Sequence, residues 1–235
     1  LAYYGVAFNI YSYLLNICTA GFPFAIATLI AKYSTRGDYQ TSLLIKKLSA
    51  SLMTCFGFGM MIIVILFSSP LAALVMPDEG DSVKTMQMVL ILISFALFFV
   101  PLLSSIRGFY QGLKHMEIYA LSQVLEQVAR VAFLLSASAI AVYALHTDQV
   151  WALYFGVIST SISAILAIMH LKLYDKKQMR ELKRLAKTQE VAGNNDRREI
   201  LKELVFIAFP YLIVAILGYS DTIVNTLFLS KGLEA

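Results

Sequence analysis

The chain has 235 residues, of which 59% are hydrophobic and only 14% are charged. Soluble domains carry about 25% charged residues, so this composition excludes an ordinary soluble protein and predicts an all-α polytopic membrane protein. The formal net charge of +4 would also suit a nucleic-acid-binding protein, but in a membrane protein such an excess belongs to cytoplasmic loops.

Six apolar stretches are long enough to cross a bilayer, for which about 20 mostly apolar residues suffice. They cover approximately residues 5–31, 48–67, 86–105, 119–143, 150–171 and 197–229. Three of them contain a proline, Pro23, Pro101 and Pro210, and each proline predicts a helix kink or, in a transporter, a bending point.

Two shorter elements are predicted between these spans. Ser68-Ser69-Pro70 is typical of a helix N-terminus and predicts a short surface helix at residues 71–76. Gly108 and Gly112 are predicted to bracket a short connection that leads into the fourth span. The two cysteines, Cys18 and Cys55, lie in apolar runs and are interpreted as buried thiols.

The fourth span carries four polar residues, Gln123, Glu126, Gln127 and Arg130, that share one helical face. If the helix begins near residue 119, Glu126 and Arg130 lie about 10 and 17 Å into the membrane. Charges at that depth are costly and face protein or water, which favours a polar cavity for a charged substrate. The alternative is a purely structural ion pair, because Glu126 precedes Arg130 by four residues.

The last span also contains polar residues, Asp221 and Asn225, which are four apart and share a face. Upstream of that span, Asp196 and Glu199 have the spacing of a capping box. The three histidines are isolated and no catalytic motif is present, so we expect neither an enzyme nor a metal or cofactor site.

The basic residues predict the orientation, because 16 of the 19 lysines and arginines follow the first, third and fifth spans. The positive-inside rule then makes the segments 32–47, 107–117 and 172–198 cytoplasmic. Residues 172–187 combine basic and apolar side chains, which predicts an amphipathic helix on anionic membrane lipids. Nucleic-acid binding is the disfavoured alternative, since membrane spans flank this patch.

Two stretches resemble a known family: GFPFAIATLIAKYSTRGDYQ at 21–40 and RGFYQGLKHMEIYALSQVLEQVARV at 107–131. They are similar to the polysaccharide-exporter branch of the MOP superfamily, which has a two-lobe MATE-like fold. Within it, the likeness is greatest to the group of Gram-positive lipid II flippases and stage V sporulation protein B. The resemblance implies that residues 1–200 form most of the N-terminal lobe without its first helix, and that 201–235 begin the second lobe.

The resemblance also implies a function: a bacterial plasma-membrane flippase that moves a polyprenyl-diphosphate-linked sugar, such as lipid II, to the outer leaflet by alternating access. Arg130 is then the candidate for the diphosphate, and Gln123 and Gln127 for sugar hydroxyls. Arg107 is either an interfacial anchor or a further head-group receptor. Glu126, Asp221 and Asn225 are candidates for ion coupling, with Glu126 alternatively a counter-ion of Arg130.

Two alternatives remain open from the sequence. The first is a cation-coupled multidrug exporter of the same superfamily, whose drug site would favour aromatic residues and a carboxylate over a buried arginine. The second is a membrane scaffold without transport activity in cell-wall or spore assembly. No pattern in the sequence identifies the head group, the coupling ion or the oligomeric state.

Overall fold

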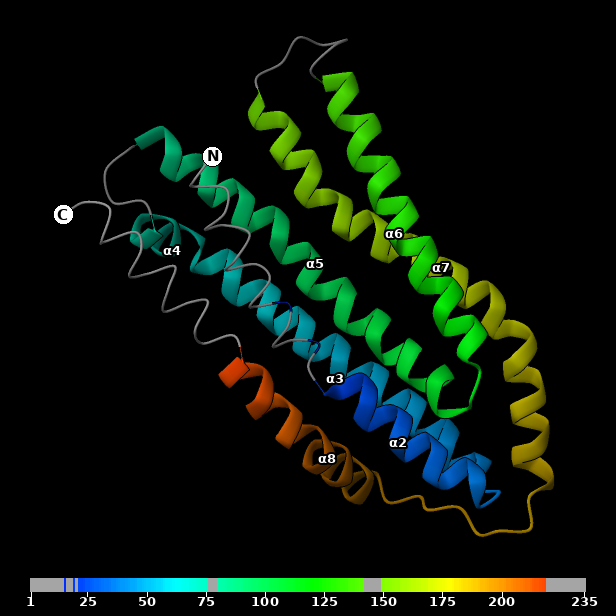
Figure 1. Cartoon of the computed structure of the whole chain (residues 1–235). Helices are drawn as coiled ribbons and strands as arrows, with labels where there is room; N and C mark the ends of the chain where they lie inside the picture. The colour runs from blue at the N-terminus through cyan, green and yellow to red at the C-terminus, as the bar shows by residue number, and fades with distance from the viewer. Residues whose placement is uncertain (1–14, 16–18, 20, 76–79, 142–148, 219–235) are drawn as a thin grey trace.

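The computed structural model describes residues 21–75, 80–141 and 149–218, together with Leu15 and Thr19. In these residues every regular element is a helix, which confirms the all-α fold (Figure 1). The helices are α2 (Phe22–Thr35), α3 (Tyr39–Leu66), α4 (Ser68–Val75), α5 (Gly80–Gly112), α6 (Met116–Ala139), α7 (Gln149–Thr188) and α8 (Arg197–Gly218).

Five of the six predicted spans are present as helices long and apolar enough to cross a membrane. They comprise α3, most of α5, α6, residues 153–176 of α7, and α8. Most of the first predicted span lies outside the described residues, and α2 is its described part. The structure therefore confirms a polytopic membrane bundle.

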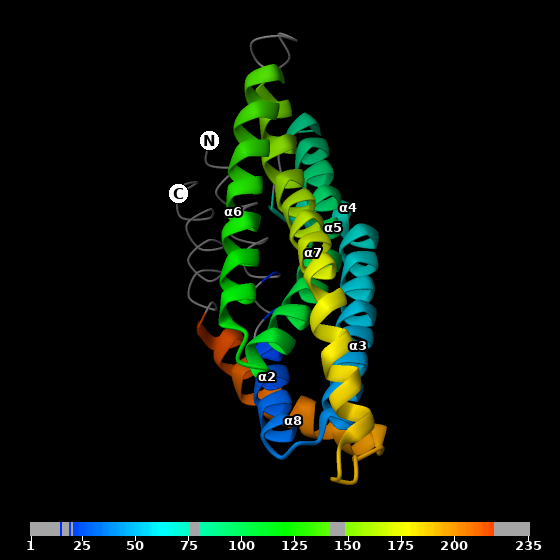
Figure 2. The ribbon, with the colours of Figure 1, turned by 90° about the vertical axis from the view of Figure 1, so that its right-hand side faces the viewer.

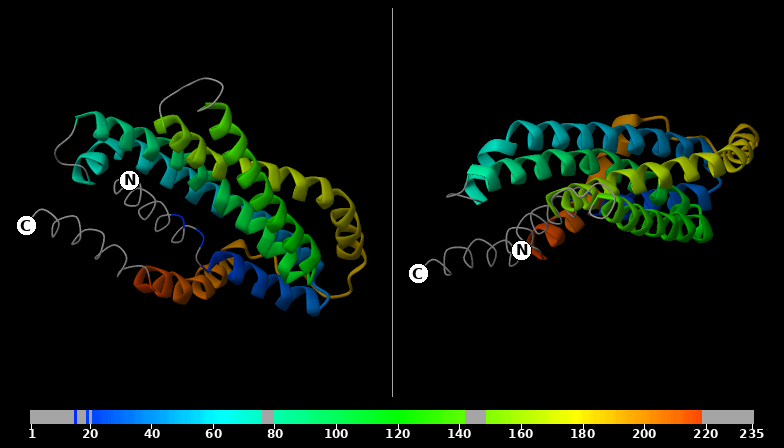
Figure 3. Two further views of the ribbon diagram at one scale, coloured as in Figure 1. Left: turned by 45° about the horizontal axis from the view of Figure 1, so that its top comes forward. Right: turned by 90° about the horizontal axis from the view of Figure 1, so that it is seen from above.

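Helix α5 is the centre of the bundle and contacts α2, α3, α4, α6 and α7. Helices α6 and α7 run side by side, and α8 packs chiefly on α2 (Figures 2 and 3). The connections α2–α3, α5–α6 and α7–α8 all lie at one end of the bundle (Figure 1). Each connection lies within one of the three segments predicted to be cytoplasmic, so the arrangement supports a single sidedness for them.

Glycines explain how closely α2 and α5 approach one another. A Cβ placed on Gly108 would lie 2.6 Å from the Pro23 carbonyl oxygen, and one on Gly112 would lie 2.6 Å from the Ile30 Cβ. The prediction of a connection between the two glycines is wrong, because α5 continues through both of them. Their role is to let two helix backbones pack in contact, as small residues do in membranes.

Other boundaries also differ from the sequence-based expectations. Helix α3 begins at Tyr39, nine residues before the predicted span, because the Asp38 side chain caps it by accepting from the Thr41 N–H. Helix α4 begins at Ser68, whose hydroxyl donates to the Ile65 carbonyl instead of capping the new helix. The N-cap at Asp196 is present, since its carboxylate accepts from the Arg198 and Glu199 N–H groups. The reciprocal bond of a capping box is replaced, because the Asp196 N–H donates to the Asn194 side-chain oxygen and Glu199 accepts from the Asn194 amide.

The basic segment is a continuation of a membrane span. Residues 172–187 belong to α7, which runs unbroken from Gln149 to Thr188 and bends before its C-terminal turns (Figure 1). The apolar residue Leu182 is buried in the main core and Met179 packs against it, whereas Leu173 is exposed. Part of the face that we expected to lie on lipid is therefore covered by the bundle, and contact with anionic lipids stays a prediction.

The three prolines occupy different positions. Pro23 lies in the first turn of α2, two residues after the N-cap residue Gly21, which has a φ of 74°. Pro101 and Pro210 lie inside α5 and α8, which remain continuous. Bending at any of them during transport stays a prediction. The expectation for Cys55 is wrong, since this free thiol is exposed, and Cys18 lies outside the described residues.

Candidate functional site

The predicted pair on α6 is part of a three-residue charged cluster. Glu126 accepts from the Arg130 guanidinium on its own helix, and its other carboxylate oxygen lies 2.8 Å from a guanidinium nitrogen of Arg107 on α5. The Glu126 side chain is 7% exposed, Arg107 13% and Arg130 30%. One buried carboxylate therefore separates two guanidinium groups.

Arg107 is fixed in place by α6. Its Nε donates to the Ser122 hydroxyl at 2.8 Å, and its terminal nitrogen donates to the Ser122 carbonyl at 2.9 Å. The interpretation of Arg107 as an interfacial anchor does not fit this geometry, because the guanidinium points to Ser122 and Glu126 and is largely buried. Sequence reasoning missed this link, since no spacing rule connects residues on either side of the α5–α6 turn.

The cluster carries a net positive charge, because two guanidinium groups share one carboxylate. Arg107 is satisfied by Glu126 and Ser122, whereas within the described part of the chain Arg130 pairs with Glu126 alone. The Nε of Arg130 is buried and has no hydrogen-bond partner among the described residues. Arg130 is therefore the member of the cluster that retains donor capacity for an anion.

Gln123 and Gln127 lie on an exposed polar stripe of α6, one turn apart, and Arg130 extends the stripe by a further turn. Glu126 lies at its edge, on the buried side that faces α5 and α7. On the other flank of the stripe, α6 exposes large apolar residues, among them Val124, Val128 and Leu135. Helix α6 thus presents three faces: one packed, one polar and open, and one suited to lipid.

Two other ion pairs join helices at the end of the bundle that is predicted to be cytoplasmic, and both are charge-balanced. Lys32 of α2 pairs with Glu203 of α8, which also accepts from the Tyr33 hydroxyl at 3.3 Å. Lys46 of α3 pairs with Asp175 of α7. The same Asp175 accepts from the buried Tyr110 hydroxyl of α5 at 2.6 Å. The sequence offered no signal for these pairs, because their members are 129 or more residues apart.

Asp38 joins the α2–α3 turn to the α7–α8 connection. Burial of its carboxyl raises the pKa, but hydrogen bonds from the Thr41 hydroxyl and N–H, the Gln189 amide and the Asn194 N–H outweigh this and hold the pKa of Asp38 below its usual value. The carboxylate thus fixes two of the predicted cytoplasmic segments to one another.

Two of the predicted site residues cannot be placed relative to the charged cluster. Asp221 and Asn225 lie outside the described residues. Within the described part of the chain, no group of three or more His, Cys, Asp or Glu side chains is arranged to hold a metal ion.

Comparison with known proteins gives a coherent set of relatives. The polysaccharide biosynthesis protein family matches residues 2–233. The lipid II flippase MurJ of Bacillus subtilis (strain 168) is 31% identical over 230 residues, which cover 94% of this chain and 42% of the flippase. Stage V sporulation protein B of the same organism is 33% identical over 113 residues, covering 47% of this chain and 20% of that protein.

A solved structure shares the fold. It is a MOP superfamily transporter from Pyrococcus furiosus Vc1 that superimposes with a TM-score of 0.64 at 17% sequence identity. The match covers 92% of this chain and 45% of that chain. The chain therefore spans less than half the length of the relatives that it matches.

Proposed function

The chain belongs to the polysaccharide biosynthesis protein family, and we propose that it forms the part of a membrane flippase that receives the charged head group of a polyprenyl-diphosphate-linked sugar. The family match and the apolar helices also establish it as a multi-pass protein of the bacterial plasma membrane. The resemblance inferred from residues 21–40 and 107–131 is thereby confirmed.

The physical problem for such a flippase lies in the head group. A diphosphate-linked sugar loses its hydration on entering hydrocarbon, whereas its polyprenyl tail is stable there. A transporter lowers the barrier by offering a polar, cationic path at membrane depth while it leaves a lateral opening to lipid. The chain therefore needs a cation that is held in the membrane but not fully neutralised.

The observation that carries the proposal is the charge imbalance of Arg107, Glu126 and Arg130. Two arginines on one carboxylate leave one positive charge, which is carried by the partly exposed and incompletely bonded Arg130. An arginine fork matches the oxygens of a diphosphate, and the bond is charge-assisted. We assign diphosphate contact to Arg130.

The surroundings of Arg130 fit the rest of the substrate. Gln123 and Gln127 line the same exposed stripe and would meet sugar hydroxyls or water. The neighbouring apolar face of α6, with Val124 and Val128, would allow the tail to remain in lipid. A polar and an apolar exposed face side by side on one helix suit an amphiphilic substrate.

Glu126 serves as the counter-ion that lowers the free-energy cost of placing two guanidinium groups in the membrane. A carboxylate already bonded to two guanidinium groups is a poor site for a further cation, because both of its oxygens are occupied. Of the ion-coupling candidates, Asp221 and Asn225 are therefore preferred. A multidrug exporter is less well supported, because the net charge of the cluster is positive and would repel cationic drugs.

The test is translocation of a labelled undecaprenyl-diphosphate sugar by the reconstituted protein carrying Arg130→Ala or Arg130→Lys. We expect Ala to reduce transport by about tenfold or more at normal membrane abundance, as for loss of a charge-assisted contact, and Lys to restore part of it. Arg184→Ala, which removes an exposed arginine near the end of α7, is the matched control. Full transport by Arg130→Ala would refute the assignment.

A further inference from the structure

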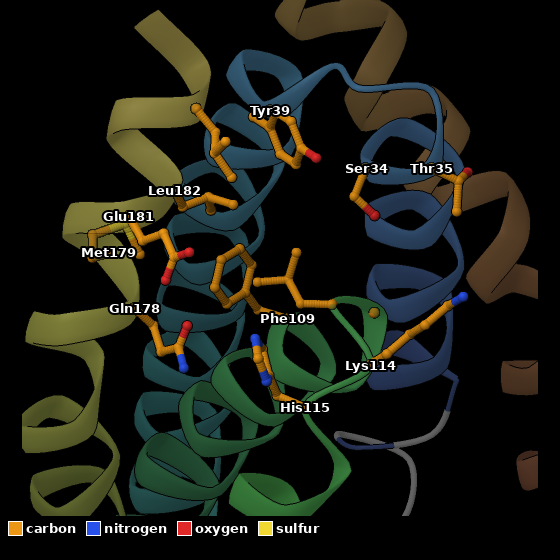
Figure 4. A pocket seen from close by; sticks show the side chains of 13 residues that line it. Ser34, Thr35, Tyr39, Phe109, Lys114, His115, Gln178, Met179, Glu181 and Leu182 are labelled. Atoms are coloured by element: carbon orange, nitrogen blue, oxygen red, sulfur yellow. The ribbon is translucent and has the colours of Figure 1, made fainter. Parts of the chain in front are cut away.

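A cavity lies at the cytoplasmic end of the bundle, away from the charged cluster of α5 and α6. It has a volume of about 400 Å³, is open on one side, and is bordered by the end of α2, the start of α3, the α5–α6 turn and the C-terminal part of α7 (Figure 4). Its floor is apolar and includes Phe109, Met179 and Leu182. The transport proposal makes no use of this cavity.

The two sides of the cavity carry opposite charge. Glu181 and Gln178 extend into it from α7, while His115 and Lys114 border it from the α5–α6 turn (Figure 4). No ion pair within 4 Å engages Lys114 or Glu181 among the described residues, and His115 pairs only with Glu117, at 3.1 Å. Glu181 therefore borders the cavity on the α7 side and Lys114 on the side of α2, with Phe109 between them (Figure 4).

Lys114 adopts a backbone conformation in which glycine is usual. Its N–H donates to the Gln111 carbonyl at 3.0 Å and the His115 N–H donates to the Tyr110 carbonyl at 3.0 Å, which is the Schellman pattern that ends α5. The residue with left-handed φ in this motif is Lys114, at 64°. A long side chain here is strained relative to glycine, so its presence at the cavity edge is better explained by its ammonium group.

The position of the cavity relative to the apolar spans indicates which part of a lipid could enter it. The spans of α5 and α6 end at Gly112 and Met116, and the span in α7 ends at Lys176. Lys114, His115 and Glu181 therefore lie just outside the apolar spans, where lipid head groups are expected. An occupant with an apolar part on the floor and two opposite charges above it matches this setting.

We propose that this cavity binds a zwitterionic phospholipid through a phosphoethanolamine head group. The phosphate lies toward Lys114 and His115, the ammonium group donates to Glu181 and the Gln178 carbonyl, and the start of the acyl chains covers the apolar floor. A purely anionic lipid would leave Glu181 repelled and unpaired. A choline head group could not donate hydrogen bonds to it.

The test is lipid retention by the full chain after extraction from vesicles of equal parts phosphatidylethanolamine, phosphatidylcholine and phosphatidylglycerol, measured by native mass spectrometry. The wild-type protein retains phosphatidylethanolamine over each of the others by about fivefold, as expected for one partly exposed charge-assisted hydrogen bond. Glu181→Gln abolishes that preference. Lys114→Gly lowers retention of all three phospholipids without lowering the melting temperature, since glycine suits this backbone.

Matched controls separate the cavity from general surface charge. Glu190→Gln and Lys187→Gln change exposed charges near the C-terminal end of α7 that do not line the cavity, and they leave the lipid preference as in the wild type. A wild-type preference for phosphatidylglycerol would overturn the proposal in favour of simple anionic attraction. An unchanged preference in Glu181→Gln, or an equal loss in Glu190→Gln, would also overturn it.

Discussion

The charged residues of this chain follow two different designs. In the cluster on α5 and α6, two arginines share Glu126, and a positive charge remains within the membrane. At the end predicted to be cytoplasmic, Lys32 pairs with Glu203 and Lys46 with Asp175, one cation to one anion. Balanced pairs fix helices to one another, whereas the unbalanced cluster retains capacity for an anionic ligand.

The difference matters because of where the charges lie. At a surface, an ion pair contributes about 0–1 kcal/mol and its loss is tolerated. In a low-dielectric region, removing one partner leaves an uncompensated charge, which costs about 3–5 kcal/mol. An excess arginine at membrane depth is therefore maintained at a cost, which favours a functional explanation over a structural one.

Removing the shared carboxylate has the largest expected effect. Glu126→Gln leaves Arg107 and Arg130 without an anion, and we expect a loss of stability of about 3–5 kcal/mol, seen as a collapse of folded protein on thermal unfolding in detergent. The double variant Arg107→Gln with Glu126→Gln should recover much of that loss. Equal stability of Glu126→Gln and the wild type would contradict the buried cluster.

Disturbing the packing that positions Arg107 should have the next largest effect. Gly108→Ala places a Cβ 2.6 Å from the Pro23 carbonyl oxygen and 3.0 Å from its Cα, so α2 and α5 must separate. We expect a loss of about 1–3 kcal/mol and weaker transport, because Arg107 lies next to this contact. Gly59→Ala, with no atom within 4 Å of the added Cβ, is the control and should be neutral.

The balanced pair between α2 and α8 should respond differently. Lys32→Ala should cost about 1 kcal/mol or less, since the Lys32 and Glu203 side chains are 39% and 26% exposed. Exchanging the charges with Lys32→Glu and Glu203→Lys should restore the melting temperature and leave transport intact. If exchange of Glu126 and Arg130 were equally harmless, the two regions would not differ as proposed.

The smallest effect concerns pH and Asp38. Because the folded-state pKa of this carboxyl lies below its ordinary value of 3.8, its contribution to stability is complete above that value and is lost as the pH falls through the folded pKa. Between pH 6 and pH 3, Asp38→Asn should therefore lose less in melting temperature than the wild type. A parallel decline in both proteins would contradict this role.

Periodicity and residue type sufficed to predict the spans, the polar face of α6 and the pairing of Glu126 with Arg130, because these depend on contacts within one helix. The glycine-mediated contact of α2 with α5 was not predictable. Gly108 and Gly112 were interpreted as the ends of a connection, because a sequence alone does not show that another helix backbone lies against them.

The missed parts of the site involve residues brought together by folding. Arg107 meets Glu126 across the α5–α6 turn, and Lys32 meets Glu203 from the far end of the chain. Neither follows from local spacing. The same limit applies to the basic segment after residue 172, whose amphipathic pattern indicated lipid, although the bundle covers Leu182.

The most direct test of the central claim compares cysteines at two adjacent positions of α6, Gln127→Cys and Val128→Cys, in a background without Cys18 and Cys55. The polar stripe predicts that a membrane-impermeant thiol reagent labels position 127 but not position 128. It also predicts that a diphosphate-linked lipid protects position 127 only when Arg130 is present. If position 127 proved as unreactive as position 128, the stripe would not face water, and Arg130 would be a structural partner of Glu126 alone.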